Sequence, residues 1–95
     1  MEIIQKDNPG INGWFRAVEN GDIIGTVTYQ WTDDTVLEID HTEVDQDREG
    51  EGIGSKLIEA VVDFAREKDV KIKPVCKFAK AILEGKEGME DVIAQ

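Results

Sequence analysis

The amino-terminal part of the chain has two runs rich in apolar residues, which are separated by a two-residue turn. The runs are residues 14–19 and residues 22–29, and Asn20 and Gly21 stand between them. Apolar and β-branched runs bounded by turn residues are typical of β-strands. Asn-Gly is a strong hairpin signal, because both central positions of the tight turn need φ > 0. These positions therefore predict an antiparallel β-hairpin.

A third run, from Val36 to about Val44, alternates between apolar and polar residues. Because side chains along a strand point to opposite faces in turn, we expect Leu37, Ile39 and His41 to share one face. A short edge strand is expected around residues 3–4. The first half of the chain thus predicts three or four antiparallel strands.

The second half has apolar residues at helical spacing between Ile53 and Lys68. The stripe consists of Ile53, Leu57, Val61, Phe64 and Ala65, which predicts one long helix with a buried face. We expect a short strand at residues 70–75, a second helix over residues 78–83 and a closing turn at residues 89–94. The predicted fold class is α+β, with an antiparallel sheet followed by helix, strand and helix in a single domain of residues 1–95.

The charge of the chain narrows the classes of partner. The 95 residues carry a formal net charge of −10 at pH 7, and all of this excess lies in residues 1–51. Contacts to nucleic-acid phosphates need a basic face, so we expect no nucleic-acid partner. The acidic half either attracts an amine or only keeps the protein soluble.

Several absences point to the cytoplasm. The chain does not begin with a basic start followed by an apolar run, as a secretory signal does, and no apolar stretch approaches the ~18 residues needed to cross a bilayer. A single cysteine, Cys76, cannot form an internal disulfide, which suits a reducing compartment. One histidine and one cysteine leave too few soft ligands for a metal site. We expect a cytoplasmic protein with no membrane partner and no metal.

Three glycines at alternate positions, Gly50, Gly52 and Gly54, lie between the third strand and the long helix. They let the backbone turn tightly and bring its N–H groups close to a ligand. The helix start adds free N–H groups and a positive dipole end, both suited to phosphate, and Ser55 and Lys56 offer a hydroxyl and a cation. The spacing matches neither a Walker loop nor a dinucleotide fingerprint. It favours a phosphorylated cofactor, with a turn that only caps the helix as the alternative.

The residues around this loop resemble the acetyl-CoA-binding motif of the GNAT superfamily of N-acetyltransferases. The pattern is Val44, then Gly50-x-Gly52-Ile53-Gly54 and Leu57, with flanking segments 39–44 and 74–78 that look like those of very short GNAT-like domains. The resemblance implies acetyl-CoA as the acetyl donor and an unidentified amine as the acceptor. The cofactor-binding residues that it implies are Thr42, Val44, Arg48, Gly50, Gly52, Ile53, Gly54, Ser55, Lys56 and Cys76.

The sequence departs from the family pattern at two places. Glu49 stands where the motif normally carries Arg or Gln, with Arg48 one place earlier. A carboxylate there opposes a pyrophosphate unless it points outward, and Arg48 is the residue that could compensate. Many GNAT enzymes use a tyrosine near the end of the chain as general acid, but the only tyrosine here is Tyr29. The alternative to an N-acetyltransferase is therefore a non-catalytic protein that binds acetyl-CoA or CoA.

Three side chains are candidates for catalysis of acetyl transfer, which needs a base for the ammonium proton and a proton source or nucleophile at the thioester. Glu43 is a candidate base, or a solvated carboxylate at a strand end. His41 is the only histidine, and is a candidate for acid–base chemistry or a hydrogen-bonded core residue. Cys76 stands at a predicted helix start, where a thiol pKa is lowered. By resemblance it accepts the acetyl group or protonates the leaving thiolate; otherwise it is a small buried residue.

Overall fold

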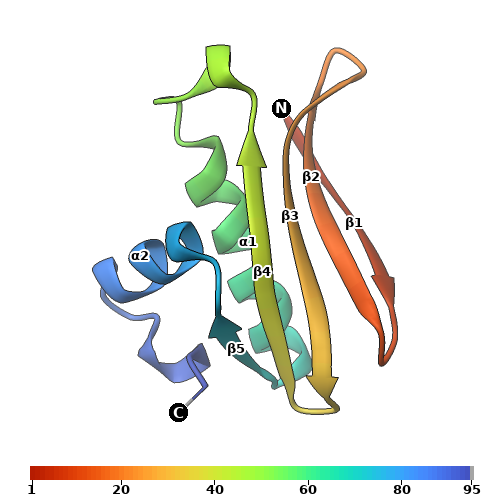
Figure 1. The fold of residues 1–95 in the computed structure, drawn as a ribbon, viewed down its shortest axis with the longest axis vertical. Helices are drawn as coiled ribbons and strands as arrows, with labels where there is room; N and C mark the ends of the chain where they lie inside the picture. Colours follow the sequence, from red (N-terminus) through yellow and green to blue (C-terminus); the bar gives the residue numbers. More distant parts are fainter. Residues whose placement is uncertain (95) are drawn as a thin grey trace.

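Five strands and two α-helices make up the fold of residues 1–94, the part of the chain that the computed structural model describes (Figure 1). The strands are β1 (Glu2–Asn8), β2 (Asn12–Glu19), β3 (Asp22–Asp33), β4 (Val36–Val44) and β5 (Lys71–Pro74). They form one sheet in the order β1-β2-β3-β4-β5. The first four strands are antiparallel, and β5 runs parallel to β4. The predicted α+β fold is confirmed.

The hairpin between β2 and β3 turns at Asn20 and Gly21, as predicted. Their φ angles are 52° and 84°, and both values lie in the left-handed region that a two-residue hairpin turn requires. Glu19 and Asp22 pair directly across the turn. The expected edge strand around residues 3–4 is the seven-residue strand β1.

Two helices lie on one side of the sheet and at its edge (Figure 1). Helix α1 (Ile53–Lys68) packs against β2, β3, β4 and β5, whereas α2 (Lys77–Gly85) contacts α1, β4 and β5. Of the predicted apolar stripe of α1, Ile53, Leu57, Val61 and Ala65 are buried and Phe64 is half-buried. The stripe is buried together because apolar residues three or four positions apart lie on one face of a helix.

The hydrophobic core is a single cluster between the sheet and the helices. The strands contribute Phe15, Ala17, Ile24, Val27, Tyr29, Leu37, Ile39 and Ile72. Full burial of one Leu or Ile side chain stabilises a fold by roughly 1.5–3 kcal/mol. Because Ile39 of β4 and Ile53 of α1 both belong to this core, the two elements on either side of the glycine loop are held in place.

The end of the described chain closes against β5. A short 3₁₀ turn, η2 (Glu90–Val92), follows α2, and the N–H of Ala94 then donates to the carbonyl of Ile72 at 2.8 Å. The predicted closing turn is confirmed. Within residues 1–94, no helix combines the length and the apolar character that a membrane span requires.

Candidate functional site

Strands β4 and β5 run side by side over only part of β4. Their pairing ends at Ile39 and Pro74. The backbone N–H groups of Val75 and Cys76 then both donate to the Ile39 carbonyl, at 3.1 and 3.0 Å. The chain turns away into α2 at this point, while β4 continues to Val44. The last part of β4 therefore borders a cleft instead of another strand.

A β-bulge at Asp40 decides which side chains of β4 face this cleft. Ile39 and His41 have consecutive partners on β3, so Asp40 is an extra residue and the alternation of faces shifts by one. Thr42 consequently lines the cleft, whereas the His41 side chain is 65% exposed. The expectation that His41 shares a face with Leu37 and Ile39 is wrong, and so is its alternative role in the core. The physical reason is that strict alternation holds only along an uninterrupted ladder.

Side chains of β3 hold the bulge in place. The Asp40 carboxylate accepts hydrogen bonds from Thr28 Oγ1 at 2.5 Å and from Gln30 Nε2 at 3.1 Å. Both donors point to the face of the sheet opposite α1, so Asp40 is directed away from the cleft. The bulge is thus stabilised by specific contacts.

Two glycines of the loop are needed for its backbone path. Gly50 and Gly52 have φ angles of 87° and 79°, values that residues with a side chain rarely adopt. Gly52 is also the N-cap residue of α1, and the helix start has no side-chain cap and no acidic residue in its first turn. The first-turn N–H groups therefore remain available to an anion at the positive end of the helix dipole.

The third glycine, Gly54, is needed because an aromatic ring lies against it. A Cβ at this position would lie 2.5 Å from Cζ of Phe78 and 2.7 Å from its Cε2, well inside van der Waals contact. The ring therefore joins the first turn of α1 to the first turn of α2. Phe78 remains 42% exposed on its other side.

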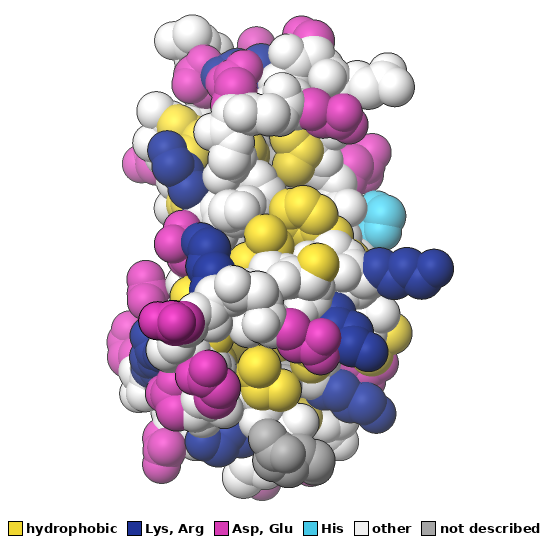
Figure 2. All heavy atoms as spheres, turned by 90° about the vertical axis from the view of Figure 1, so that its left-hand side faces the viewer, with side chains coloured by type: hydrophobic (Ala, Val, Ile, Leu, Met, Phe, Trp, Pro, Cys, Tyr) yellow, Lys and Arg dark blue, Asp and Glu magenta, His cyan; other side chains and the backbone are white. Residues whose placement is uncertain are grey.

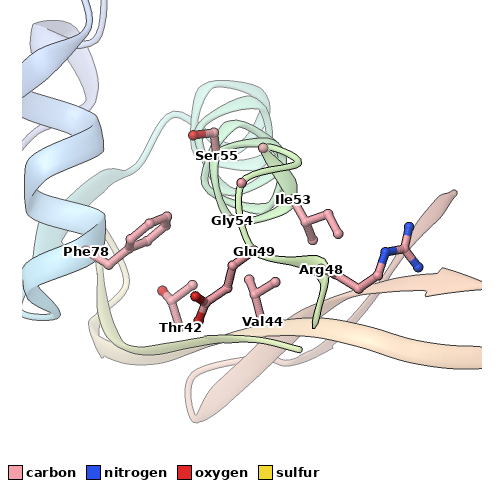
Figure 3. Close-up of a pocket in the computed structure, with 10 residues that line it drawn as sticks. Thr42, Val44, Arg48, Glu49, Ile53, Gly54, Ser55 and Phe78 are labelled. Atoms are coloured by element: carbon pink, nitrogen blue, oxygen red, sulfur yellow. The ribbon is translucent and has the colours of Figure 1, made fainter. Parts of the chain in front are cut away.

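The cleft has a volume of about 480 Å³. Figure 3 shows it between β4, the glycine loop and the starts of the two helices. It is lined by Thr42, Val44, Arg48, Glu49, Gly50, Gly52, Ile53, Gly54, Ser55 and Phe78. Eight of the ten residues expected to hold a cofactor are in this set; Lys56, exposed on α1, and Cys76 are not. Phe78 is a lining residue that sequence reasoning missed, although it lies in the family-like segment 74–78.

The outer surface at this site is partly apolar. Figure 2 shows hydrophobic side chains gathered in the middle of this face, below the charged loop at the top. Val75 and Phe78, both near the start of α2, are 51% and 42% exposed. A ligand in the cleft can therefore bury apolar area and also meet backbone N–H groups.

Charges around the loop differ from those of a simple anion site. Arg48 contacts Glu19 and Glu51, each at 2.9 Å, and hydrogen bonds with Glu51 and then Glu19 raise the pKa of the guanidinium. In Figure 3 the Arg48 side chain extends away from Thr42, whereas Glu49 extends from the loop toward β4. Glu49 thus lies in the cleft, and Arg48 is already engaged by two carboxylates of the same chain.

Cys76 is the N-cap residue of α2 and lies next to the cleft-lining residue Thr42. Its thiol donates a hydrogen bond to Thr42 Oγ1, at 3.6 Å. Partial burial raises the pKa of this thiol, but hydrogen bonds with the N–H of Ala79, the Thr42 hydroxyl and the N–H of Phe78 outweigh it and bring the pKa below its ordinary value. A lowered pKa increases the fraction of thiolate, the reactive form. The reactive role of Cys76 stays a prediction, as does its alternative as a small buried residue.

His41 and Glu43 lie together outside the cleft. His41 Nε2 is 3.7 Å from Glu43 Oε2, and the two side chains are 65% and 78% exposed. On β4 they take the face opposite that of Thr42 and Val44. The structure therefore does not bring them together with the cleft-lining residues, and their catalytic roles stay predictions.

Tyr29 is not positioned to serve as the missing general acid. Its hydroxyl donates to Asp7 at 2.6 Å and accepts from Gln5 Nε2 at 3.2 Å. Burial, followed by the hydrogen bond to Asp7, raises the pKa of Tyr29. The residue belongs to the core and does not line the cleft.

Comparisons with known proteins agree with this fold. A family model described as GCN5-related N-acetyl-transferase matches residues 14–92. An NMR structure of a GCN5-like protein from Staphylococcus aureus, named as a candidate N-acetyltransferase, is 38% identical with a TM-score of 0.73; the match covers 98% of this chain and 87% of that one. No curated protein gives a significant match.

More distant structures share the fold. The ribosomal-protein-S18-alanine N-acetyltransferase of Escherichia coli is 22% identical with a TM-score of 0.66, and the match covers 78% of this chain and 50% of that enzyme. A Bacillus anthracis protein named as a candidate streptothricin acetyltransferase, solved with acetyl coenzyme A, is 21% identical with a TM-score of 0.63; the match covers 76% of this chain and 46% of that one.

Proposed function

Because this chain belongs to the GCN5-related N-acetyltransferase family, we propose that it transfers the acetyl group of acetyl-CoA to an amine. The observation that carries the proposal is the cleft at the point where β4 and β5 separate. It combines an uncapped helix N-terminus with two left-handed glycines, and the Cys76 thiol lies beside it, in contact with the lining residue Thr42.

The residues of the cleft fit the two halves of such a donor. Backbone N–H groups around Gly52 and Gly54, with the Ser55 hydroxyl, would hold the pyrophosphate, as helix N-termini bind phosphate. Val44, Ile53 and the exposed ring of Phe78 offer apolar walls for the uncharged arm of the cofactor. Acetyl-CoA supplies an activated acetyl thioester. One feature opposes the fit, because the Glu49 carboxylate repels a pyrophosphate.

We assign Cys76 as the acetyl-accepting residue. Its thiolate attacks the thioester carbonyl, so that an S–C bond to Cys76 forms while the bond to the coenzyme sulfur breaks and the coenzyme leaves as a thiolate. The amine then attacks the acetyl carbon, which forms the N–C bond and releases the Cys76 thiolate, and one proton passes from the amine to a base. His41 and Glu43, the bases expected from the sequence, lie on the outer face of β4, opposite Thr42, so neither is assigned as that base. Direct transfer from the thioester to the amine is the competing route.

The cellular setting follows from the same residues. A mechanism that needs Cys76 as a free thiol fits a reducing compartment, such as the cytoplasm. The net charge of −10 suits a cationic amine as the acceptor and disfavours nucleic acid and anionic membrane surfaces as partners. The acceptor itself is unassigned.

An NMR titration tests the cofactor site. Labelled protein is titrated with acetyl-CoA and with CoA, and ATP serves as a nucleotide control that lacks the apolar arm. We expect amide shifts with both CoA species concentrated in residues 42–57 and around Cys76. Shifts confined to other residues, or none at millimolar ligand, would contradict the proposal.

Turnover with a primary amine separates the two functions that the cleft allows. Glu49 in the cleft favours the second candidate, a protein that binds acetyl-CoA or CoA without efficient transfer. Release of free CoA that depends on the added amine supports the enzyme. Saturable binding without amine-dependent release supports the binding protein.

A further inference from the structure

The hydroxyl of Thr42 meets the sulfur of Cys76 across the opening of the sheet. The two residues are 34 positions apart, and their side-chain atoms Oγ1 and Sγ lie 3.6 Å apart. Thr42 belongs to the part of β4 beyond the bulge, and Cys76 is the N-cap residue of α2. This contact therefore joins the end of β4 to the start of α2 beside the cleft.

The bulge at Asp40 is what makes the contact. With uninterrupted alternation from Ile39, Thr42 would point to the outer face of β4, and the shift of one residue turns it toward α2 instead. A β-branched side chain on a strand has few χ1 rotamers, so the direction of the Thr42 hydroxyl is restricted. The bulge thus points the Thr42 side chain, whose χ1 angle is restricted, toward the Cys76 thiol.

A hydroxyl can serve both charge states of this sulfur. The neutral thiol donates to Thr42 Oγ1, and after loss of the proton the direction reverses, because a thiolate only accepts and a threonine hydroxyl also donates. A hydrogen bond to the charged partner is the stronger of the two. Glu49 lines the same cleft as Thr42, whereas the exposed pair of His41 and Glu43 is on the other face of β4.

We infer that Thr42 is a positioning residue, which donates a hydrogen bond to the Cys76 thiolate and holds the sulfur at the opening between β4 and β5. The inference rests on the proposed function, since a held thiolate matters only if Cys76 takes part in transfer. The helix N-terminus favours the negative charge whichever way the sulfur points. The hydrogen bond from the Thr42 hydroxyl also sets the direction of the sulfur, which it keeps oriented toward β4 and the cleft.

The test measures the rate at which iodoacetamide alkylates Cys76 as a function of pH in the protein without any acetyl donor. Thr42→Val keeps the shape and the strand preference of the residue but removes the hydroxyl, so we expect the midpoint of the profile to rise by about half to one pH unit. Thr42→Ser keeps the hydroxyl and should stay near the wild-type midpoint. Thr32→Val is the matched control, because Thr32 is exposed and its hydroxyl donates only to the Val36 carbonyl, at 3.1 Å.

The outcomes separate this inference from the proposed function. A Thr42→Val profile that coincides with wild type, or a Thr42→Ser profile that shifts as far as that of Thr42→Val, overturns the positioning role even if the wild type acetylates amines. A shift in Thr42→Val alone supports it even if no turnover is found. Circular dichroism of each variant verifies the fold, and if Thr42→Val is unfolded, Thr42→Ala is measured against Thr42→Ser with the same two criteria.

Discussion

The contact between Gly54 and Phe78 allows one prediction to be worked out in numbers. In Gly54→Ala the new Cβ would lie 2.5 and 2.7 Å from two atoms of the Phe78 ring, whereas carbon atoms in contact lie about 3.5–4.0 Å apart. The ring is 42% exposed and can rotate outward, so the cost should fall at the low end of the ~1–3 kcal/mol of an overpacked site. Alanine in a helix gains roughly 0.5–1 kcal/mol over glycine. The two effects nearly cancel, and the free energy of unfolding should change by less than about 1 kcal/mol.

A double-mutant cycle measures the steric clash between a side chain at position 54 and the Phe78 ring, which the small net change in stability conceals. In a Phe78→Ala background the obstacle is absent, so Gly54→Ala should stabilise by about 0.5–1 kcal/mol, which gives a coupling energy of about 1 kcal/mol. Gly85→Ala is the matched control, because a Cβ at Gly85 meets nothing within 4 Å. Urea unfolding followed by circular dichroism gives all the values. Equal effects of Gly54→Ala in the two backgrounds would refute the contact.

The same substitution should weaken the cofactor site. The displaced ring no longer forms its present wall of the cleft, so Gly54→Ala should bind acetyl-CoA less tightly, while Gly85→Ala should bind it as wild type does. Isothermal titration calorimetry measures both affinities. Unchanged affinity in Gly54→Ala would show that Phe78 is not part of the cofactor surface.

The remaining predictions concern charge and the thiol. Glu49→Arg should tighten CoA binding, most strongly at low salt where exposed charges are least screened. Glu84→Arg on α2 makes the same charge change away from the cleft lining and should leave CoA binding unchanged. Equal effects of the two substitutions would mean that Glu49 does not face the cofactor. Cys76→Ala should abolish transfer and keep CoA binding, and mass spectrometry should find an acetyl group on Cys76 of the wild type; full activity of the variant would leave direct transfer as the mechanism. Folding lowers the pKa of Cys76, so the unfolded chain binds more protons than the folded chain at pH values between the two pKa values. The free energy of unfolding should therefore rise with pH over that range. Cys76→Ser should not show this rise. A wild-type curve as flat as that of Cys76→Ser would show that the folded thiol has an ordinary pKa.

Much of the fold follows from local patterns in the chain. The Asn20-Gly21 turn, the apolar stripe from Ile53 to Ala65 and the glycines before it each depend on residues close in sequence, and the structure has each element where the pattern predicts it. The resemblance of segment 39–57 to a cofactor motif also uses neighbouring residues only. This is why eight expected residues do line one cleft.

The features that the sequence did not predict depend on contacts between residues far apart in the chain. The engagement of Arg48 depends on Glu19, on a different strand, and the need for glycine at position 54 depends on the Phe78 ring of another helix. Neither pairing leaves a local signal, because a salt bridge or a close contact is set by the relative placement of whole elements. Sequence reasoning could name these residues but not their partners.

The sequence by itself determined the order of strands and helices, the flexible backbone positions Gly50 and Gly52, and the presence of one thiol at the start of a helix. The tertiary structure decided which face each side chain of β4 takes. Strand pairing with β3 inserts the bulge at Asp40, and one extra residue in a pattern of period two exchanges the faces of everything after it. His41 thereby goes to solvent and Thr42 comes to Cys76, because the hydrogen-bond ladder between two strands, and not the chain alone, sets the direction of their side chains.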